Sequence, residues 1–490
     1  MSARPISFSI RDALFGESAA LVLGPLAAVL AVVFVLAHWT FALLCGVTIV
    51  TLAALETERF LLGVVFLIPV SWIAGIKFPL GYGAERLDIA TAIRLLAVGS
   101  FLASRLLRDP HSFGRLLRVP ITKLSFLLAA VTFASLIFGG YGLMYDSLKA
   151  VARLLSYVGF YLFLVLWVNS RVRLRRVALT IMFSTVLVAA FGIFQEVVGD
   201  YTSFWLFLNP PTEFFVPMDH RVPSLLANCN SLAGYLNLVI PFSLACWVLG
   251  EERWKKVGAW TTGLGIAALL CTQSLGGIGA FCGVVVFAIL CFAGNWKKKL
   301  ALLAAVCALV IAFYFAKGIL NPAHEGADFS YDQATRIVLW GIAWDFFTGS
   351  PMLGVGWGNF SALYGSYVAG ISWIPAGVFA AHSIYLQLLA ETGLIGFGAF
   401  SLLIFRAVRL GIRQLRSSVN TFDKALAFGV LGAILTVLLH GFVDFFFQVS
   451  PQFGTLFWLL LALLVVNGRT FIESGRLRSS GQIPATSSLV

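Results

Sequence analysis

Charged side chains are scarce in this chain. Only 11% of its 490 residues are Asp, Glu, Lys or Arg, whereas 60% are hydrophobic. A soluble domain has roughly 25% charged residues and about half apolar ones, so the deficit excludes an ordinary globular protein. The alternating strands of about ten residues that a membrane barrel needs are also missing.

Patterns that hold metals or disulfides are missing too. The seven Cys residues are scattered without CxxC spacing, and most lie inside apolar runs, which is typical of small core residues. No HExxH motif is present, so metal ligation by His382, His440 and Asp444 is a weak alternative. We therefore expect no metal and no cofactor.

Long apolar runs fill most of the chain instead. A run of about 20 apolar residues crosses a hydrocarbon core of about 30 Å as a helix. The sequence therefore predicts an all-α polytopic membrane protein with about 12–14 transmembrane helices in one domain, residues 1–473. Residues 474–490 are rich in Ser and Gly, and we expect a disordered cytoplasmic tail there. The predicted spans are 19–37, 39–55, 60–76, 88–106, 122–138, 148–168, 176–198, 228–250, 257–273, 276–294, 300–316, 384–405, 424–446 and 450–467.

Basic residues exceed acidic ones, and the formal net charge is +12. Most of the 34 Lys and Arg residues fall in loops that an even number of predicted spans separates. Lys and Arg gather in the cytoplasmic loops of membrane proteins, which accounts for the charge without a nucleic-acid partner and predicts that both termini are cytoplasmic. The exceptions lie on the predicted outer side and are Lys77, Arg86, Arg94, Lys149, Arg153, Arg221, Lys317 and Arg336.

Two predicted outer segments are long, at about 199–227 and 317–383. The second contains TRIVLWGIAWDFF, which predicts a Trp-rich amphipathic helix of the kind that lies at a membrane interface. The Gly-rich turn PMLGVGWGNF follows it, but this turn lacks the GxxxxGK(S/T) pattern that cradles nucleotide phosphates. The residues expected on one apolar face of the predicted helix are Ile337, Trp340, Trp344 and Phe347.

His382 precedes the predicted span 384–405, on the same side as Arg221 and Arg336. Histidine has an unperturbed pKa of about 6.5 and accepts a proton near neutral pH. Arginine donates two parallel hydrogen bonds to a pyrophosphate. One base and two arginines suit the transfer of a group from a phosphate-linked donor to a hydroxyl, with no metal required. The structural alternatives are a helix cap for His382 and interfacial anchoring for Arg336.

Two further pairs of ionisable residues lie near the outer ends of predicted spans. Lys149 and Arg153 share one helix face, and they could bind a diphosphate or extend to lipid headgroups. His440 and Asp444 have the same spacing, and they could support the site or form an interhelical hydrogen bond. Ionisable residues inside a membrane are functional suspects by default, which adds Arg94 as a weak candidate.

Four stretches of the chain resemble the O-antigen ligase and Wzy-type polymerase superfamily of bacterial envelope glycan enzymes. Their order matches the family, and the many-helix layout covers nearly the whole chain. The sequence departs from the family at Leu275, where many relatives have an Arg, and at Cys229, where a Pro is common. The stretches are RVPSLLANCNSLAGYLNLVIPF at 221–242, TRIVLWGIAWDFFTGSPMLGVGWGNF at 335–360, HSIYLQLLAETGLIG at 382–396 and HGFVDFFFQVSPQFGTLFWLL at 440–460.

The resemblance implies an inverting, metal-independent glycan transferase of the GT-C type in the bacterial inner membrane, with its active site facing the periplasm. The donor would be an undecaprenyl-diphosphate-linked oligosaccharide or polysaccharide. In ligases the acceptor is a sugar hydroxyl on lipid A–core, which we favour here. In polymerases of O-antigen or exopolysaccharide it is the end sugar of another lipid-linked unit. Membrane lipids and other envelope polysaccharide proteins are the further partners that this implies.

The resemblance also implies roles for the matched residues. His382 would be the base or would position the acceptor, and Arg221 and Arg336 would bind the diphosphate, with Lys149 and Arg153 as further candidates. If His382 is not the base, Tyr385 or Glu391 would position the acceptor, or His440 would activate it. The residues expected to support the site are Ser383, Tyr385, Glu391, His440 and Asp444.

A transporter for a lipid-linked glycan is the remote alternative. Transporters often show inverted repeats and charged or broken helices at the bilayer midplane. The sequence shows no repeat, and Arg94 is its one candidate for a basic residue along a central cavity.

Overall fold

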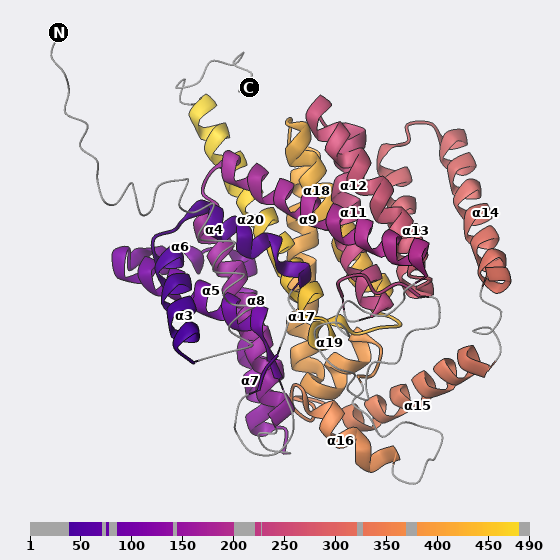
Figure 1. The fold of residues 1–490 in the computed structure, drawn as a ribbon, viewed down its shortest axis with the longest axis horizontal. Helices are drawn as coiled ribbons and strands as arrows, with labels where there is room; N and C mark the ends of the chain where they lie inside the picture. The colour runs from indigo at the N-terminus through magenta and orange to yellow at the C-terminus, as the bar shows by residue number, and fades with distance from the viewer. Residues whose placement is uncertain are drawn as a thin grey trace.

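The chain folds into a bundle of helices. The computed structural model describes residues 39–70, 75–77, 86–140, 145–199, 221–226, 228–320, 327–368 and 380–479. Two helices, α15 and α16, lie at one end of the bundle, and the C-terminal end of α20 lies at the other (Figure 1). The elements are α3 (Trp39–Ala54), α4 (Glu58–Phe66), the 3₁₀ turn η1 (Ile68–Val70), β1 (Gly75–Lys77), β2 (Arg86–Asp88), α5 (Ile89–Arg108), α6 (His111–Leu116), α7 (Pro120–Phe138), α8 (Tyr145–Trp167), α9 (Arg171–Val198), α11 (Cys229–Leu249), α12 (Glu252–Cys271), α13 (Leu275–Phe292), α14 (Trp296–Leu320), α15 (Ala327–Gly349), α16 (Asn359–Val368), α17 (Ile384–Ser417), α18 (Thr421–His440), α19 (Phe446–Val449) and α20 (Pro451–Ser479).

Eight helices in the described ranges are long and apolar enough to cross a membrane. They are α7, α8, α9, α11, α13, α17, α18 and α20, and each overlaps a predicted span. This confirms an all-α polytopic membrane protein. The predicted spans 39–55, 88–106, 257–273 and 300–316 also overlap helices, namely α3, α5, α12 and α14. The predicted span 19–37 lies outside the described residues.

One predicted span is wrong in its second half. The prediction placed a helix over 60–76, but α4 ends at Phe66 and η1 follows. Pro69 explains this end, because proline lacks an amide hydrogen and disfavours the α conformation in the residue before it. Further along, β1 and β2 pair as an antiparallel hairpin with Gly75 opposite Asp88, which the sequence did not predict.

The C-terminal helix is longer than its predicted span. The apolar pattern predicted 450–467, and α20 continues to Ser479, into the segment expected to be a tail. Residues 480–490 lie outside the described ranges.

The predicted interfacial helix is present as α15, and it has two apolar faces. Ile337 and Trp344 are 66% and 52% exposed, so part of the predicted face is open, as in a helix at a membrane interface. Another face buries Leu339, Ile342 and Phe346 in a small core that includes residues of α16 and α17. The helix is therefore fixed against the start of α17.

The centre of the bundle is α11. Its side chains are buried on every side from Leu232 to Phe242, as expected for a helix that is apolar all round. It packs against α12 and α18, and α18 also contacts α13 and α17. The helices α11 and α18 therefore form the buried middle of the bundle.

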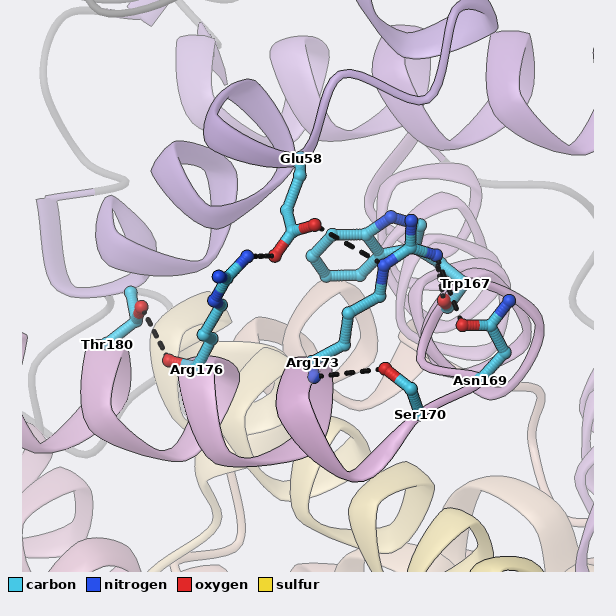
Figure 2. A network of polar contacts seen from close by, with 7 residues as sticks. All are labelled: Glu58, Trp167, Asn169, Ser170, Arg173, Arg176 and Thr180. Carbon is cyan, nitrogen blue, oxygen red and sulfur yellow. Dashed lines mark hydrogen bonds and ion pairs between the residues drawn. The ribbon is translucent and has the colours of Figure 1, made fainter. Parts of the chain in front are cut away.

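Polar contacts fix the start of α9 against α4. The Glu58 carboxylate forms two ion pairs. Arg173 Nε lies 3.5 Å from Glu58 Oε2, and Arg176 Nη1 lies 2.5 Å from Glu58 Oε1. The Arg173 guanidinium also lies 5.6 Å from the centre of the Trp167 ring, so one arginine joins three segments of the chain (Figure 2). These contacts hold α4, the end of α8 and the first turn of α9 together.

The same end of α9 also meets the start of α18. Arg171 Nη2 lies 3.0 Å from Asp423 Oδ2, in the first turn of α18. Since α18 has 20 residues, its other end at His440 is about 30 Å away at a rise of about 1.5 Å per residue. The arginine cluster of α9 and the surroundings of His382 are therefore at opposite ends of the bundle.

Candidate functional site

His382 lies in a short segment that leads into α17. Its backbone has a φ of +45°, in the left-handed region that a non-glycine residue adopts only when its surroundings hold it there. The Ala381 N–H donates to Gln387 Oε1 at 2.6 Å, and the Ile384 N–H donates to the Gly441 carbonyl oxygen at 2.7 Å. These contacts fix the backbone on both sides of His382. The His382 side chain is 31% exposed, so it remains accessible.

The contact between Ile384 and Gly441 requires a glycine. A Cβ at position 441 would lie 2.5 Å from Ile384 Cγ2. The apolar pattern predicted one helix over 424–446, but α18 ends at His440 and the chain turns before the short helix α19. This correction matters for the site, because the turn carries Asp444 to His382.

The imidazole of His382 is paired with a buried carboxylate. Its Nδ1 lies 3.3 Å from Asp444 Oδ1, which also accepts the Phe445 N–H at 2.8 Å. Burial disfavours the charged form of Asp444, but the hydrogen bond and charge of His382 and the charge of His440 together lower the pKa of this carboxyl. An ionised Asp444 holds a proton on Nδ1. The other ring nitrogen, Nε2, has no hydrogen-bond partner in the described part of the chain.

His440 lies behind Asp444 and is 1% exposed. Its ring packs edge-on against Phe446, with ring centres 4.7 Å apart, and its Nδ1 has no hydrogen-bond partner among the described residues. A Cβ on Gly276 would lie 2.9 Å from His440 Cδ2, so the start of α13 packs tightly on this ring. Within the described ranges, no three His, Cys, Asp or Glu side chains group closely enough to hold a metal ion.

Two arginines flank this turn. Arg221 donates from Nε to the Thr272 carbonyl oxygen at 3.1 Å and from Nη2 to Asn230 Oδ1 at 2.9 Å. Arg336, on α15, lies within electrostatic range of His440 and has no ion-pair partner in the ranges that the structure describes. A histidine–carboxylate pair and two arginines therefore lie at the same end of the bundle. With Asp444 ionised and His382 neutral, these four side chains carry a net positive charge.

Arg221 and Asp444 both lie near the start of α11. The Cys229 thiol is buried and lies within electrostatic range of both residues. The N-termini of α11 and α13 both lie in this region, since Arg221 contacts the first turn of α11 and His440 packs on the first turn of α13. Helix N-termini carry partial positive charge and favour anions.

Lys149 and Arg153 lie on α8, and Arg153 contacts α19. Arg153 donates to the carbonyl oxygen of Gln448, in α19, and Lys149 is partly buried one turn earlier on α8. The Gln448 amide in turn donates to Glu391 Oε2 at 2.6 Å. These contacts connect α8 and α19 to α17, and none of them joins Arg153 to Arg221 among the described residues.

Glu391 lies where α17 is interrupted, and it is completely buried. Its carboxyl oxygens accept the Phe360 N–H at 3.0 Å and the amide of Gln448, with further hydrogen bonds from the Gly358 N–H and the Gln387 side chain. A buried carboxylate with several donors is well satisfied. It joins α16, α17 and α19 behind the site.

The Gly-rich turn fills the interruption in α17. Gly393 breaks the helix with φ +60° and ψ −164°, and the Val355 N–H donates to the Ala390 carbonyl oxygen at 2.8 Å. A Cβ on Gly354 would lie 2.5 Å from Ala390 O and from Thr392 N. The turn is therefore a packing element rather than a phosphate cradle. The alternation of glycines at 354, 356 and 358 was the available sequence signal for such close backbone contact.

Ser383 and Tyr385 lie at the start of α17, directly after His382. Ser383 occupies the N-cap position of α17, is buried and makes no side-chain cap hydrogen bond. The Tyr385 hydroxyl donates to the Leu438 carbonyl oxygen at 2.7 Å, and its ring packs on Phe442. Tyr385 therefore attaches the start of α17 to the last turn of α18. Gln387 also contacts the His382 segment, and the sequence analysis did not single it out.

Residues 260–401 match the family model described as O-antigen ligase. The matched region runs from α12 into α17 and contains Arg336, the Gly-rich turn, His382 and Glu391. A search of curated proteins found no match. The family match confirms the resemblance to the O-antigen ligase and Wzy-type superfamily. The protein is thus a multi-pass membrane protein, and the matched region supports a function of the O-antigen ligase or polymerase type.

Proposed function

We propose that the protein transfers a glycan from an undecaprenyl-diphosphate-linked donor to a sugar hydroxyl at the periplasmic face of the inner membrane. The observation that carries the proposal is the partly exposed His382, whose Nδ1 pairs with buried Asp444 at 3.3 Å. The O-antigen ligase match supports the substrate class.

In this proposal His382 activates the acceptor hydroxyl. Nε2 takes the hydroxyl proton while the hydroxyl oxygen attacks the anomeric carbon of the donor sugar. The bond from that carbon to the diphosphate oxygen breaks, and the lipid diphosphate leaves with the bonding electrons. Attack from the side opposite the leaving group inverts the anomeric centre. Asp444 orients the ring and stabilises the imidazolium that forms, as a carboxylate does beside a catalytic histidine.

The two arginines bind the leaving diphosphate. Arg336 has no acidic partner in the described ranges, so its charge is available to an anion, and its planar guanidinium donates two hydrogen bonds in parallel. Arg221 adds a second cation, and the N-termini of α11 and α13 add partial positive charge. This environment stabilises the charge that grows on the leaving oxygen, which is the work that a metal ion does in other transferases.

Lipid A–core is the acceptor that we favour, which makes the protein a ligase. The alternative acceptor is another lipid-linked glycan, which makes it a polymerase, and the same base and arginines serve both. Ser383, Tyr385, Glu391 and His440 support the site in either case. The participation of Lys149 and Arg153 in diphosphate binding stays a prediction, since Arg153 hydrogen-bonds α19.

The test is transfer by purified protein in detergent with EDTA. An undecaprenyl-diphosphate oligosaccharide is offered with lipid A–core in one tube and alone in the other. We expect product on lipid A–core, and we expect His382→Ala to be slower by about 100- to 10,000-fold, the usual contribution of a general base. Lengthened donor would identify a polymerase. Near-normal turnover by His382→Ala would reject the base, and no product with the wild type would favour a transporter.

A further inference from the structure

Contacts with neighbouring residues must fix the backbone conformation of His382. Its φ of +45° is unfavourable for a residue with a Cβ, and such residues persist only where neighbouring contacts fix them. The Ile384 N–H contact with Gly441 fixes the chain on the C-terminal side. The contact on the N-terminal side is the Ala381 N–H, which Gln387 Oε1 accepts at 2.6 Å.

Gln387 connects the buried core of the protein to the backbone next to His382. Its side chain is 1% exposed, and it also hydrogen-bonds the carboxyl of Glu391. Glu391 in turn is fixed by the Phe360 N–H and the Gln448 amide. A continuous chain of hydrogen bonds thus runs from α16 and α19, through Glu391 and Gln387, to the residue before His382.

We propose that Gln387 is a positioning residue for the glycan transfer, which holds the Ala381–His382 backbone so that the His382 ring faces both Asp444 and the acceptor hydroxyl. The inference rests on the proposed role of His382 as the base. Without the Gln387 amide, the buried Ala381 N–H loses its acceptor, and the backbone of His382 relaxes toward negative φ. The ring then moves away from Asp444.

Gln387→Met tests the positioning role, because Met has a similar length and no hydrogen-bonding amide. The matched control is Gln414→Met, in the same helix at its opposite end. Gln414 is also buried, donates to the Leu464 carbonyl oxygen at 2.8 Å and accepts from Asn467 Nδ2 at 2.7 Å. Both variants lose a buried amide, so both should lose similar thermal stability, and only Gln387 contacts the His382 segment.

In the transfer assay we expect Gln387→Met to lower kcat by about 100-fold, the usual effect of a displacement of about 1 Å in a catalytic group. The KM for the undecaprenyl-diphosphate oligosaccharide should stay near the wild-type value, because the diphosphate contacts are unchanged. Gln414→Met should keep the wild-type kcat. Equal kcat values for the two variants would overturn the inference.

An exchange of the two side chains gives a second test. Gln387→Glu alone places a carboxylate beside the Glu391 carboxylate, whereas Gln387→Glu combined with Glu391→Gln restores one donor and one acceptor between the positions. We expect the double variant to be more active than Gln387→Glu alone, a coupling that two independent structural defects do not show. A double variant no more active than the single one would reject the chain of hydrogen bonds.

A readout without substrate separates this inference from the proposed function. Diethyl pyrocarbonate acylates neutral imidazole, and the rate at His382 can be followed by mass spectrometry. We expect the rate to rise in Gln387→Met, where the ring leaves Asp444, and to stay at the wild-type value in Gln414→Met. If the rate is unchanged in both, the positioning role is wrong. If the rate rises while His382→Ala retains turnover, Gln387 holds the ring but His382 is not the base.

Discussion

Asp444 links the stability of the protein to pH. Because the pKa of this carboxyl is lower in the folded protein, its contribution to stability is fully present above about pH 4, the ordinary pKa of Asp. This contribution is lost as the pH falls through the lower pKa that Asp444 has in the folded protein. We therefore expect the difference in Tm between the wild type and Asp444→Asn, measured in detergent, to be largest near neutral pH and to shrink below about pH 4. A difference that stays constant across this range would contradict the ionised state of Asp444.

Arg336 is a cation with no ion-pair partner in the described ranges, so its replacement should affect catalysis and leave stability unchanged. Arg336→Lys keeps the charge but loses the planar fork, and we expect kcat/KM to fall by about 10- to 100-fold, the cost of a lost charged hydrogen bond.

The matched control for Arg336 is Arg171, which pairs with Asp423 at the other end of the bundle. Arg171→Ala leaves a buried carboxylate without its partner, and we expect it to lower the free energy of unfolding by about 1–3 kcal/mol. Its kcat/KM should stay at the wild-type value. A loss of stability in Arg336→Lys of the same size would show that Arg336 is a structural residue.

Single residues of the site were predictable from chemical type, but their contacts were not. His382, Arg221 and Arg336 stood out because each is ionisable and lies on the sparsely charged side of the predicted topology. The pairing of His382 with Asp444 joins residues 62 positions apart, and it depends on the turn after α18, which the apolar pattern concealed. The contact of Gln387 with the His382 segment gave no signal, because the partner there is a backbone N–H.

Among the elements, the Gly-rich turn and the break in α17 form one unit. Gly354 has a φ of +67°, and a Cβ there would lie 2.5 Å from Ala390 O. We expect Gly354→Ala to lower the free energy of unfolding by about 2–4 kcal/mol, because both the backbone conformation and the packing oppose it. Thermal unfolding in detergent measures the change.

Gly365→Ala, in the neighbouring helix α16, is the control for this unit. Nothing lies within 4 Å of a Cβ there, and no positive φ is required. An alanine in a helix is favoured over glycine by about 0.5–1 kcal/mol, so this variant should be as stable as the wild type or more so. If Gly354→Ala were as stable as the wild type, the Gly-rich turn would not be packed into the break of α17.

The elements themselves were largely predictable, and their ends less so. Apolar runs specify helices because a spanning backbone must satisfy its own hydrogen bonds, and the predicted boundary between the spans 257–273 and 276–294 coincides with the start of α13 at Leu275. The hairpin of β1 and β2 and the end of α4 were missed. Strands of three residues are too short to show an alternating pattern in the sequence. The end of α4 was missed because the apolar run continues past Pro69.

At the scale of the whole molecule, the proposed function requires α15 to face the periplasm. Asp345 is exposed on α15, and Ser417 is exposed at the opposite end of α17. We expect a membrane-impermeant maleimide to label Asp345→Cys in intact spheroplasts, and to label Ser417→Cys only after lysis, in a background without the native cysteines. Labelling of Ser417→Cys alone in intact spheroplasts would invert the topology.

The positive charge of Arg336 has a consequence for the close of the catalytic cycle. In the donor, the diphosphate is esterified at both ends, and transfer of the glycan frees one oxygen, so the departing lipid carries more negative charge than the substrate did. The arginines that lower the barrier therefore hold the product more tightly than the donor. We expect the spent lipid carrier to act as a competitive inhibitor, and its removal from the membrane to set the pace of glycan delivery.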